Sequence, residues 1–290
     1  MSVLDEAFIK AYRKRMQTPT TQAGGSAPAP AASPRRPQTM HGRQSEAVPQ
    51  PHAAFAAAAP RPAPEGPAVE AAFEVPHFIW PAIVTELLAR APAEFARASA
   101  WLAAMVDRSP KVVLMAGMLR GEGRTTVLLA LAQAAAQRKL RCALVDLDFF
   151  KPELADRLGI MAQVGGEEVF SGDLPLGDAL VESLAEPLSV LPLVRPLAAP
   201  DRVTAKRRVS ATLQLLRRSH DLVLVDAPPL DSDAQAVDLA AILSGSVVQD
   251  AVVVRDPQRV AADEMRLVNR RLAAAGVSRW HIIENFVQAA

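Results

Sequence analysis

A glycine-rich segment near the middle of the chain restricts its fold more than any other feature. This segment, Arg120–Thr126, reads RGEGRTT. It follows an apolar run at 111–116 and precedes another at 127–132, an order that predicts a strand, a loop and a helix. Backbone N–H groups in such a loop point at an anion, and the helix N-terminus adds the positive end of its dipole. The segment therefore predicts a phosphate-binding loop, with Arg124 at the position where the Walker A pattern has lysine.

Short apolar runs alternate with helical patterns from Lys111 to the end of the chain. This alternation is typical of parallel strands joined by right-handed crossovers, with helices on both faces of the sheet. We therefore expect an α/β fold, a doubly wound and mainly parallel sheet of the P-loop type, over residues 109–290, with ligands at the carboxyl ends of the strands. The predicted strands are Val112–Ala116, Arg141–Asp146, Leu188–Leu193, Leu222–Asp226, Ala251–Arg255 and His281–Glu284. The predicted helices are Thr125–Lys139, Arg202–Arg218, Asp233–Leu243 and Val260–Ala275.

Three segments precede this nucleotide-binding domain. Residues 1–16 fit a short amphipathic helix whose second half is basic, and residues 17–74, rich in Ala and Pro, fit a disordered linker. Residues 75–108 fit a helical packing segment that contains two helices. The N-terminal helix has two interpretations. It is either a marginal helix with a solvated charged end, or a docking helix for a partner or an anionic membrane surface.

Charge and apolar content limit the partners and the compartment. The formal net charge is +1, which argues against a dedicated nucleic-acid-binding surface. No apolar run reaches the roughly 18 to 20 residues that cross a bilayer, and the N-terminus lacks a signal-peptide hydrophobic region. The single cysteine, Cys142, excludes an intrachain disulfide and is expected in the core. We therefore expect a cytoplasmic protein.

Acidic residues follow two of the predicted strands. Asp146 and Asp148 lie at alternate positions where one strand ends, so both carboxylates can point the same way. Asp226 follows four apolar residues, the arrangement in which a Walker B acid holds Mg²⁺. Such carboxylates suit Mg²⁺ or the deprotonation of an attacking hydroxyl. The alternatives are that Asp146 caps the segment after it, that Asp148 is merely exposed, and that Asp226 is an ordinary strand-end acid.

These three segments together resemble the ParA/MinD class of P-loop ATPases and, more closely, the bacterial tyrosine kinases (BY-kinases) of capsule and exopolysaccharide synthesis. The BY-kinase patterns are GEGKTT, DxDxRxP and DxPP. This chain has GEGRTT from Gly121, DLDFFKP from Asp146 and DAPP from Asp226. The lysine near the loop start that marks ParA/MinD dimers is absent, which favours the kinase branch. The resemblance covers residues 111–287.

The resemblance implies ATP and Mg²⁺ as ligands. Thr125, Asp148 and Asp226 would serve the metal, and Asp146 or Asp148 would lie nearest to an incoming tyrosine hydroxyl. Arg124 would take the catalytic role of the phosphate-binding lysine. The implied nucleotide-binding residues are Gly121, Glu122, Gly123, Arg124, Thr125, Thr126 and, at the adenine, Asn285. Such proteins work beside a membrane-bound polysaccharide chain-length regulator and form ring-like homo-oligomers, which implies a partner for the N-terminal helix and a place at the inner face of the membrane.

Three departures from the BY-kinase pattern matter. Arg124 puts a planar, forked guanidinium where a compact ammonium is usual, so binding can persist where catalysis fails. Phe150 stands where the family usually has arginine. The only tyrosine is Tyr12, so a C-terminal tyrosine cluster is absent and the phosphoacceptor is expected in a partner. Two other hypotheses therefore stay open, a ParA/MinD-like positioning ATPase and a pseudokinase that binds nucleotide as a structural signal.

Overall fold

The computed structural model describes residues 69–107, 111–197, 199–231, 239–243 and 245–285. The predictions for the N-terminal helix, for Tyr12 and for the linker up to residue 68 lie outside the described residues. The same holds for residues 233–238 of a predicted helix, whose last part, 239–243, is described and helical. Within the described part of the chain, no helix combines the length and the hydropathy that a membrane span requires.

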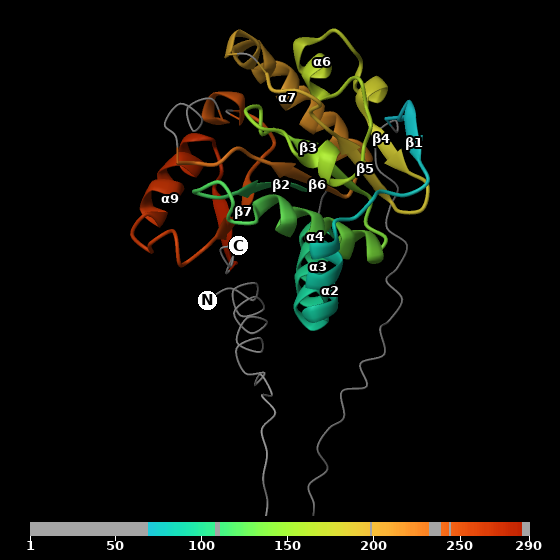
Figure 1. Ribbon diagram of the computed structural model, residues 1–290. Coiled ribbons are helices and arrows are strands. Elements are labelled where there is room, and N and C mark those ends of the chain that lie inside the picture. The colour runs from blue at the N-terminus through green and yellow to red at the C-terminus, as the bar shows by residue number, and fades with distance from the viewer. Residues whose placement is uncertain (1–68, 108–110, 198, 232–238, 244, 286–290) are drawn as a thin grey trace, which may run out of the picture.

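One mainly parallel sheet of eight strands forms the centre of the molecule (Figure 1), which confirms the predicted fold class. The strand order is β1-β4-β5-β3-β6-β2-β7-β8, and only β4 and β5 run antiparallel to each other. The crossovers leave β2, β3 and β6 side by side in the middle of the sheet. The strands are β1 (Phe73–Val75), β2 (Lys111–Ala116), β3 (Cys142–Asp146), β4 (Val181–Ser183), β5 (Leu188–Leu191), β6 (Leu222–Asp226), β7 (Asp250–Arg255) and β8 (Arg279–Glu284).

Helices cover both faces of the sheet, so the central strands are apolar on both sides. On β6, Val223 and Val225 pack into the core on one face, while Leu222 and Leu224 pack into the core on the other. Figure 1 shows α6 and α7 over one face and α2, α3 and α4 over the opposite face. The helices are α2 (Ala82–Arg90), α3 (Pro92–Val106), α4 (Arg124–Gln137), α5 (Leu154–Arg157), α6 (Gly166–Ser171), α7 (Ala199–Ser219) and α9 (Met265–Ala274), with a 3₁₀ turn, η1, at Leu176–Ala179.

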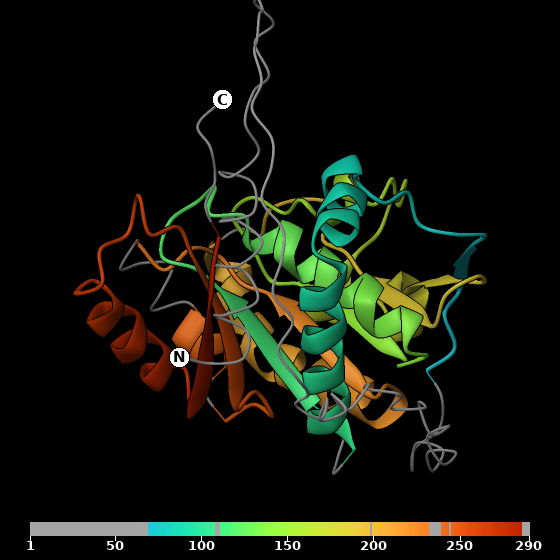
Figure 2. The ribbon, with the colours of Figure 1, turned by 90° about the horizontal axis from the view of Figure 1, so that it is seen from below.

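The helix α4 is buried on nearly all sides, because it lies between the sheet and two further helices. Its residues Val127 to Ala132 are all fully buried. Figure 2 shows α2 and α3 lying across α4 on the side away from the sheet, in agreement with their contacts. Leu102 of α3 is fully buried in the same core as α4. The helices α2 and α3, which precede the glycine loop in the chain, therefore hold α4 in place. The glycine loop ends at the first turn of α4.

Two of the differences between predicted and observed boundaries have a cause in the tertiary structure. The predicted linker extends to residue 74, yet Phe73–Val75 forms the edge strand β1, which pairs with β4. A three-residue strand has too few positions to show a period, and its pairing depends on the distant β4. The sequence also predicts a helix from Val260, but α9 begins only at Met265. Before it, side chains satisfy the backbone: Arg255 Nε donates to the Val260 carbonyl at 2.9 Å, and Glu264 accepts from the Ala261 N–H.

A buried histidine joins α7 to the sheet at the end opposite the glycine loop. His220 is 8% exposed, and its Nδ1 lies 3.1 Å from the Leu216 carbonyl oxygen. Because that carbonyl can only accept, the neutral ring donates from Nδ1. Its Nε2 then accepts from the Ser189 hydroxyl at 3.1 Å. Burial lowers the pKa of His220 to about 4, since an imidazolium here would lose its hydration.

Lowering the pH from 7 to 5 is therefore expected to remove about 2 kcal/mol of stability through His220 alone. The unfolded imidazole takes up a proton below about pH 6.5, whereas the folded one stays neutral until about pH 4, so acid favours unfolding in this window. Urea unfolding at several pH values measures the effect. The variant His220→Gln removes the titrating ring and should show a shallower pH dependence. Equal slopes for the two proteins would contradict the prediction.

Candidate nucleotide site

The glycine loop connects the carboxyl end of β2 to the first turn of α4, as the sequence predicts. Gly121 and Gly123 have φ values of +85° and +84°, in the left-handed region where a Cβ is strained. Gly123 is the N-cap of α4, and its carbonyl accepts from the Val127 N–H at 2.9 Å. Thr126 is half-buried in the first turn of that helix. A glycine loop at the start of a 14-residue helix fits the phosphates of a nucleotide.

Arg124 ties this loop to the carboxyl ends of β3 and β6. Its Nε donates to Asp226 at 2.6 Å, and its Nη2 donates to Asp148 at 3.3 Å. The Arg124 side chain is 8% exposed, and the two aspartates are 2–3% exposed. Burial opposes the charge of the guanidinium, but the facing Asp226 outweighs it and raises the Arg124 pKa. A permanently charged guanidinium therefore lies at the centre of the site.

The aspartate Asp226 also bonds to the first turn of α4. Thr125 donates its hydroxyl to Asp226 Oδ2 at 2.7 Å, while Arg124 occupies Oδ1. In the sheet, Asp226 is the register partner of Met115 on β2 and of Asp146 on β3. Parallel pairing thus places the end of β6 directly beside the loop, which brings together residues that are about 100 positions apart in the sequence.

Asp146 and Asp148 serve different partners, although they are only two residues apart. Asp146 is 1% exposed and accepts backbone N–H groups from Asp148, Glu153 and Leu154 at 2.9, 3.2 and 3.2 Å. These bonds agree with the alternative in which Asp146 caps the segment that follows it. Burial raises the pKa of Asp146 well above its usual value, and the nearby charge of Asp226 adds to the effect. A deeply buried carboxyl held by the backbone is poorly placed to meet an incoming hydroxyl.

Asp148 lies among positively charged groups. Arg120 approaches Asp148 with both guanidinium tips, at 3.1 and 3.4 Å, in addition to Arg124. The backbone N–H groups of Phe150 and Lys151 also donate to Asp148 Oδ1, at 3.4 and 3.1 Å. Arg120 is 37% exposed at its side chain. Arg120 was not among the predicted site residues, although an arginine inside a phosphate loop is a signal that could have identified it.

Two residues predicted to contact the nucleotide also form hydrogen bonds that hold the loop in place from inside. Glu122 is 1% exposed, and its two oxygens accept from the N–H groups of Leu119 at 2.6 Å and Asp256 at 3.0 Å. Burial raises the Glu122 pKa, and the backbone donors oppose this rise. Asn285, at the end of β8, donates from its side-chain amide to the Glu122 carbonyl at 2.8 Å. These bonds link the glycine loop to the carboxyl ends of β7 and β8.

A further arginine reaches the loop from the segment after β7. Arg259 donates to the Arg120 carbonyl at 3.0 Å, and its guanidinium lies 3.2 Å from where a Cβ on Gly121 would stand. Nothing in the local sequence around Arg259 indicated this position, because it depends on the turn that follows β7. Three arginines, at positions 120, 124 and 259, therefore surround the loop.

The carboxylate oxygens predicted to bind Mg²⁺ already accept hydrogen bonds from other side chains of the protein. Carboxylate and hydroxyl oxygens are the right chemical class for Mg²⁺. All four carboxylate oxygens of Asp148 and Asp226 accept hydrogen bonds, with guanidinium groups on three of them and Thr125 on the fourth. Among the described residues, no group of three or more His, Cys, Asp or Glu side chains is arranged to hold a metal. As arranged, these residues do not fit a divalent cation.

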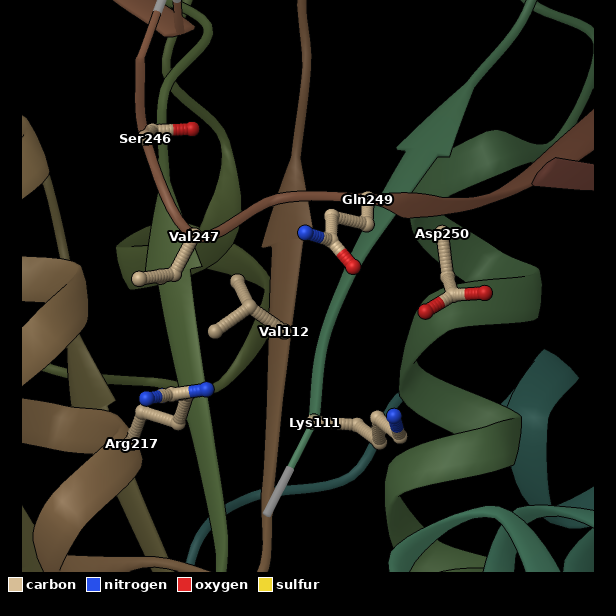
Figure 3. Close-up of a pocket in the computed structure, with 7 residues that line it drawn as sticks. All are labelled: Lys111, Val112, Arg217, Ser246, Val247, Gln249 and Asp250. Atoms are coloured by element: carbon tan, nitrogen blue, oxygen red, sulfur yellow. The ribbon is translucent and has the colours of Figure 1, made fainter. Parts of the chain in front are cut away.

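A small cavity of about 170 Å³ lies at the opposite, amino-terminal edge of β2 and β7. Its lining residues are Lys111, Val112, Arg217, Ser246, Val247, Gln249 and Asp250. Figure 3 shows the side chain of Lys111 extending away from Arg217, so the two cations do not converge on one point. Asp250 is held by Arg279 at 2.8 and 3.0 Å. This cavity is separate from the glycine loop and shares none of its residues.

Comparison with known proteins places these features in a class, although no family model matches the chain. A putative septum site-determining protein MinD from Guillardia theta is 28% identical over 177 residues, which are 60% of this chain and 63% of the relative. The tyrosine-protein kinase YwqD from Bacillus subtilis is 27% identical over 145 residues, which are 50% of this chain and 61% of the relative. The chain thus spans less than two thirds of either relative.

Solved structures show the same fold. The VpsO kinase domain is 26% identical, with a TM-score of 0.56, and the match covers 67% of this chain and 95% of that domain. MinD from Pyrococcus horikoshii, solved as a complex with Mg-ADP, is 22% identical with a TM-score of 0.50, and covers 60% of this chain and 69% of that one. The glycine loop, the strand-end acids and these relatives lead to one conclusion. The chain is similar to the class of P-loop ATPases that includes MinD and the bacterial tyrosine kinases.

Proposed function

We propose that this chain binds ATP at the glycine loop and transfers its γ-phosphoryl group to a tyrosine of a partner protein in polysaccharide assembly. The observation that carries the proposal is the convergence of Arg124, Thr125, Asp148 and Asp226 at the carboxyl edge of the sheet. The similarity to the tyrosine-protein kinase YwqD supports the choice of tyrosine as the acceptor. The partner implied by the resemblance is a membrane-bound chain-length regulator.

The residues of this site divide the work of phosphoryl transfer. The loop N–H groups and the arginines would hold the phosphates in line with the acceptor, which is the main requirement of this reaction. The tyrosine oxygen forms a bond to the γ-phosphorus as the bond to the ADP oxygen breaks, and the phenolic proton passes to a base. Asp148 is the better candidate for that base, because it faces Arg120, whose side chain is 37% exposed, whereas Asp146 accepts backbone donors from within the chain. The products are ADP and a phosphotyrosine.

Transfer of label from γ-labelled ATP to a co-purified partner tests the proposal. The native chain is expected to label the partner, and Asp148→Asn is expected to abolish labelling, because the amide cannot take up the phenolic proton. Circular dichroism of the variant is the control for folding. No labelled partner in any preparation, with intact ATP binding, would exclude the kinase function and leave a nucleotide-binding protein.

A second candidate is a nucleotide-switched positioning ATPase, favoured by the 28% identity with a MinD protein. In that case ATP would drive dimerisation and recruitment to anionic vesicles, and sedimentation with such vesicles would detect it. A third candidate is a pseudokinase, favoured by the ion pairs that engage Arg124. It predicts ATP binding without turnover in the native chain and a gain of turnover in Arg124→Lys.

A further inference from the structure

The site contains more permanent positive charge than a metal-dependent P-loop needs. Asp148 and Asp226 together carry two negative charges, and the guanidinium groups of Arg120 and Arg124 bonded to them carry two positive charges. A divalent cation placed on these carboxylates would therefore sit beside two guanidinium groups. Like charges at such short range in a buried site are strongly unfavourable.

Arg124 also cannot leave these carboxylates easily. Its Nε bond to Asp226 is 2.6 Å long and is buried, and a guanidinium does not give up its proton in a protein. A lysine could withdraw as a flexible point charge, whereas the planar fork of arginine is held by two acceptors at once. Arginine has five N–H donors, so the two bonds to the carboxylates leave further donors for phosphate oxygens.

We propose that Arg124 takes the place of the divalent metal in this chain, so that nucleotide binds the glycine loop without Mg²⁺. Arg259 and the N-terminus of α4 then add positive charge beside the phosphates, and Arg124 offers them its remaining N–H donors in place of the metal. This inference rests on the proposed nucleotide binding, but it makes a separate prediction about the metal.

Titration calorimetry of ADP with the full chain tests this inference, because ADP excludes turnover from the measurement. The Kd of the native chain is expected to change less than about 3-fold between MgCl₂ and EDTA, whereas Arg124→Lys should lose at least about 10-fold in EDTA. Arg90→Lys is the matched control, because this arginine is exposed on α2 and pairs with Glu86, outside the glycine loop. The Kd of this variant for ADP should change as little between MgCl₂ and EDTA as that of the native chain.

Each outcome separates this inference from the proposed function. ADP binding by the native chain in MgCl₂ that weakens 10-fold or more in EDTA overturns the inference and preserves nucleotide binding. No ADP binding in either buffer overturns both. If the ADP affinity of Arg124→Lys depends on Mg²⁺ as little as that of the native chain, Arg124 does not replace the metal.

A second measurement needs no variant: Mn²⁺ alone is added to the native chain and followed by its EPR signal. The native chain should leave the free-ion signal unchanged, and tight Mn²⁺ binding would overturn the inference.

Discussion

Replacing Asp226 with alanine is expected to lower the free energy of unfolding by about 3 kcal/mol. The substitution leaves the Arg124 guanidinium buried without its closest acceptor, at 2.6 Å, and also removes the acceptor of the Thr125 hydroxyl. Removing one partner of a buried ion pair costs about 3–5 kcal/mol, and the lower end applies because Asp148 stays within 3.3 Å of Arg124. Urea unfolding followed by tryptophan fluorescence measures the change.

Two further variants show whether the buried charge is the cause. Glu86 forms an exposed ion pair with Arg90 on α2, so Glu86→Ala should cost less than about 1 kcal/mol. Adding Arg124→Met to Asp226→Ala removes the unpaired charge, so the double variant should be more stable than Asp226→Ala alone. If Asp226→Ala costs no more than Glu86→Ala, the bond between Arg124 and Asp226 does not persist in solution.

Replacing Glu122 with alanine is expected to lower the free energy of unfolding by about 3 kcal/mol, because two backbone N–H groups, one buried and one part-buried, lose their acceptor at once. Leu119 donates to Glu122 from the position just before the glycine loop, and Asp256 donates from the position just after β7. An unsatisfied buried donor costs about 1–3 kcal/mol, and a void where the side chain stood adds to that. The loop also loses its connection to β7, so ADP affinity should fall together with stability.

The variant Glu122→Gln separates lost hydrogen bonding from lost volume. Its amide keeps one accepting oxygen and turns the other position into a donor. The free energy of unfolding of Glu122→Gln should therefore lie between those of the native chain and of Glu122→Ala. Hydrogen exchange at the Leu119 and Asp256 amides is the direct readout. Protection of both amides that is unchanged in Glu122→Ala would show that Glu122 is not their acceptor.

The central strands and the glycine loop could be predicted from the sequence because their signals are local. The four apolar residues before Asp226 and the order of strand, loop and helix around Gly121 and Gly123 each lie within a few consecutive residues. The spacing of apolar residues reflects the repeat of a helix or strand, and a glycine reflects the conformation of the backbone at its own position. Both signals can be read from neighbouring residues alone. The prediction was less accurate where a partner distant in sequence decides the outcome, as for β1, whose pairing depends on β4.

By itself, the sequence determined the parallel α/β fold, the position of the phosphate loop and the acids at the ends of β3 and β6. The tertiary structure alone decided what those groups bind. Strand pairing places Asp226 beside Asp146, burial leaves Asp146 to the backbone, and Arg124 reaches Asp148 and Asp226 across the loop. The bonds from the Leu119 and Asp256 N–H groups to Glu122 were likewise decided by the tertiary structure. A side chain's partner depends on which elements pack around it, and the order of residues along the chain does not specify that packing locally.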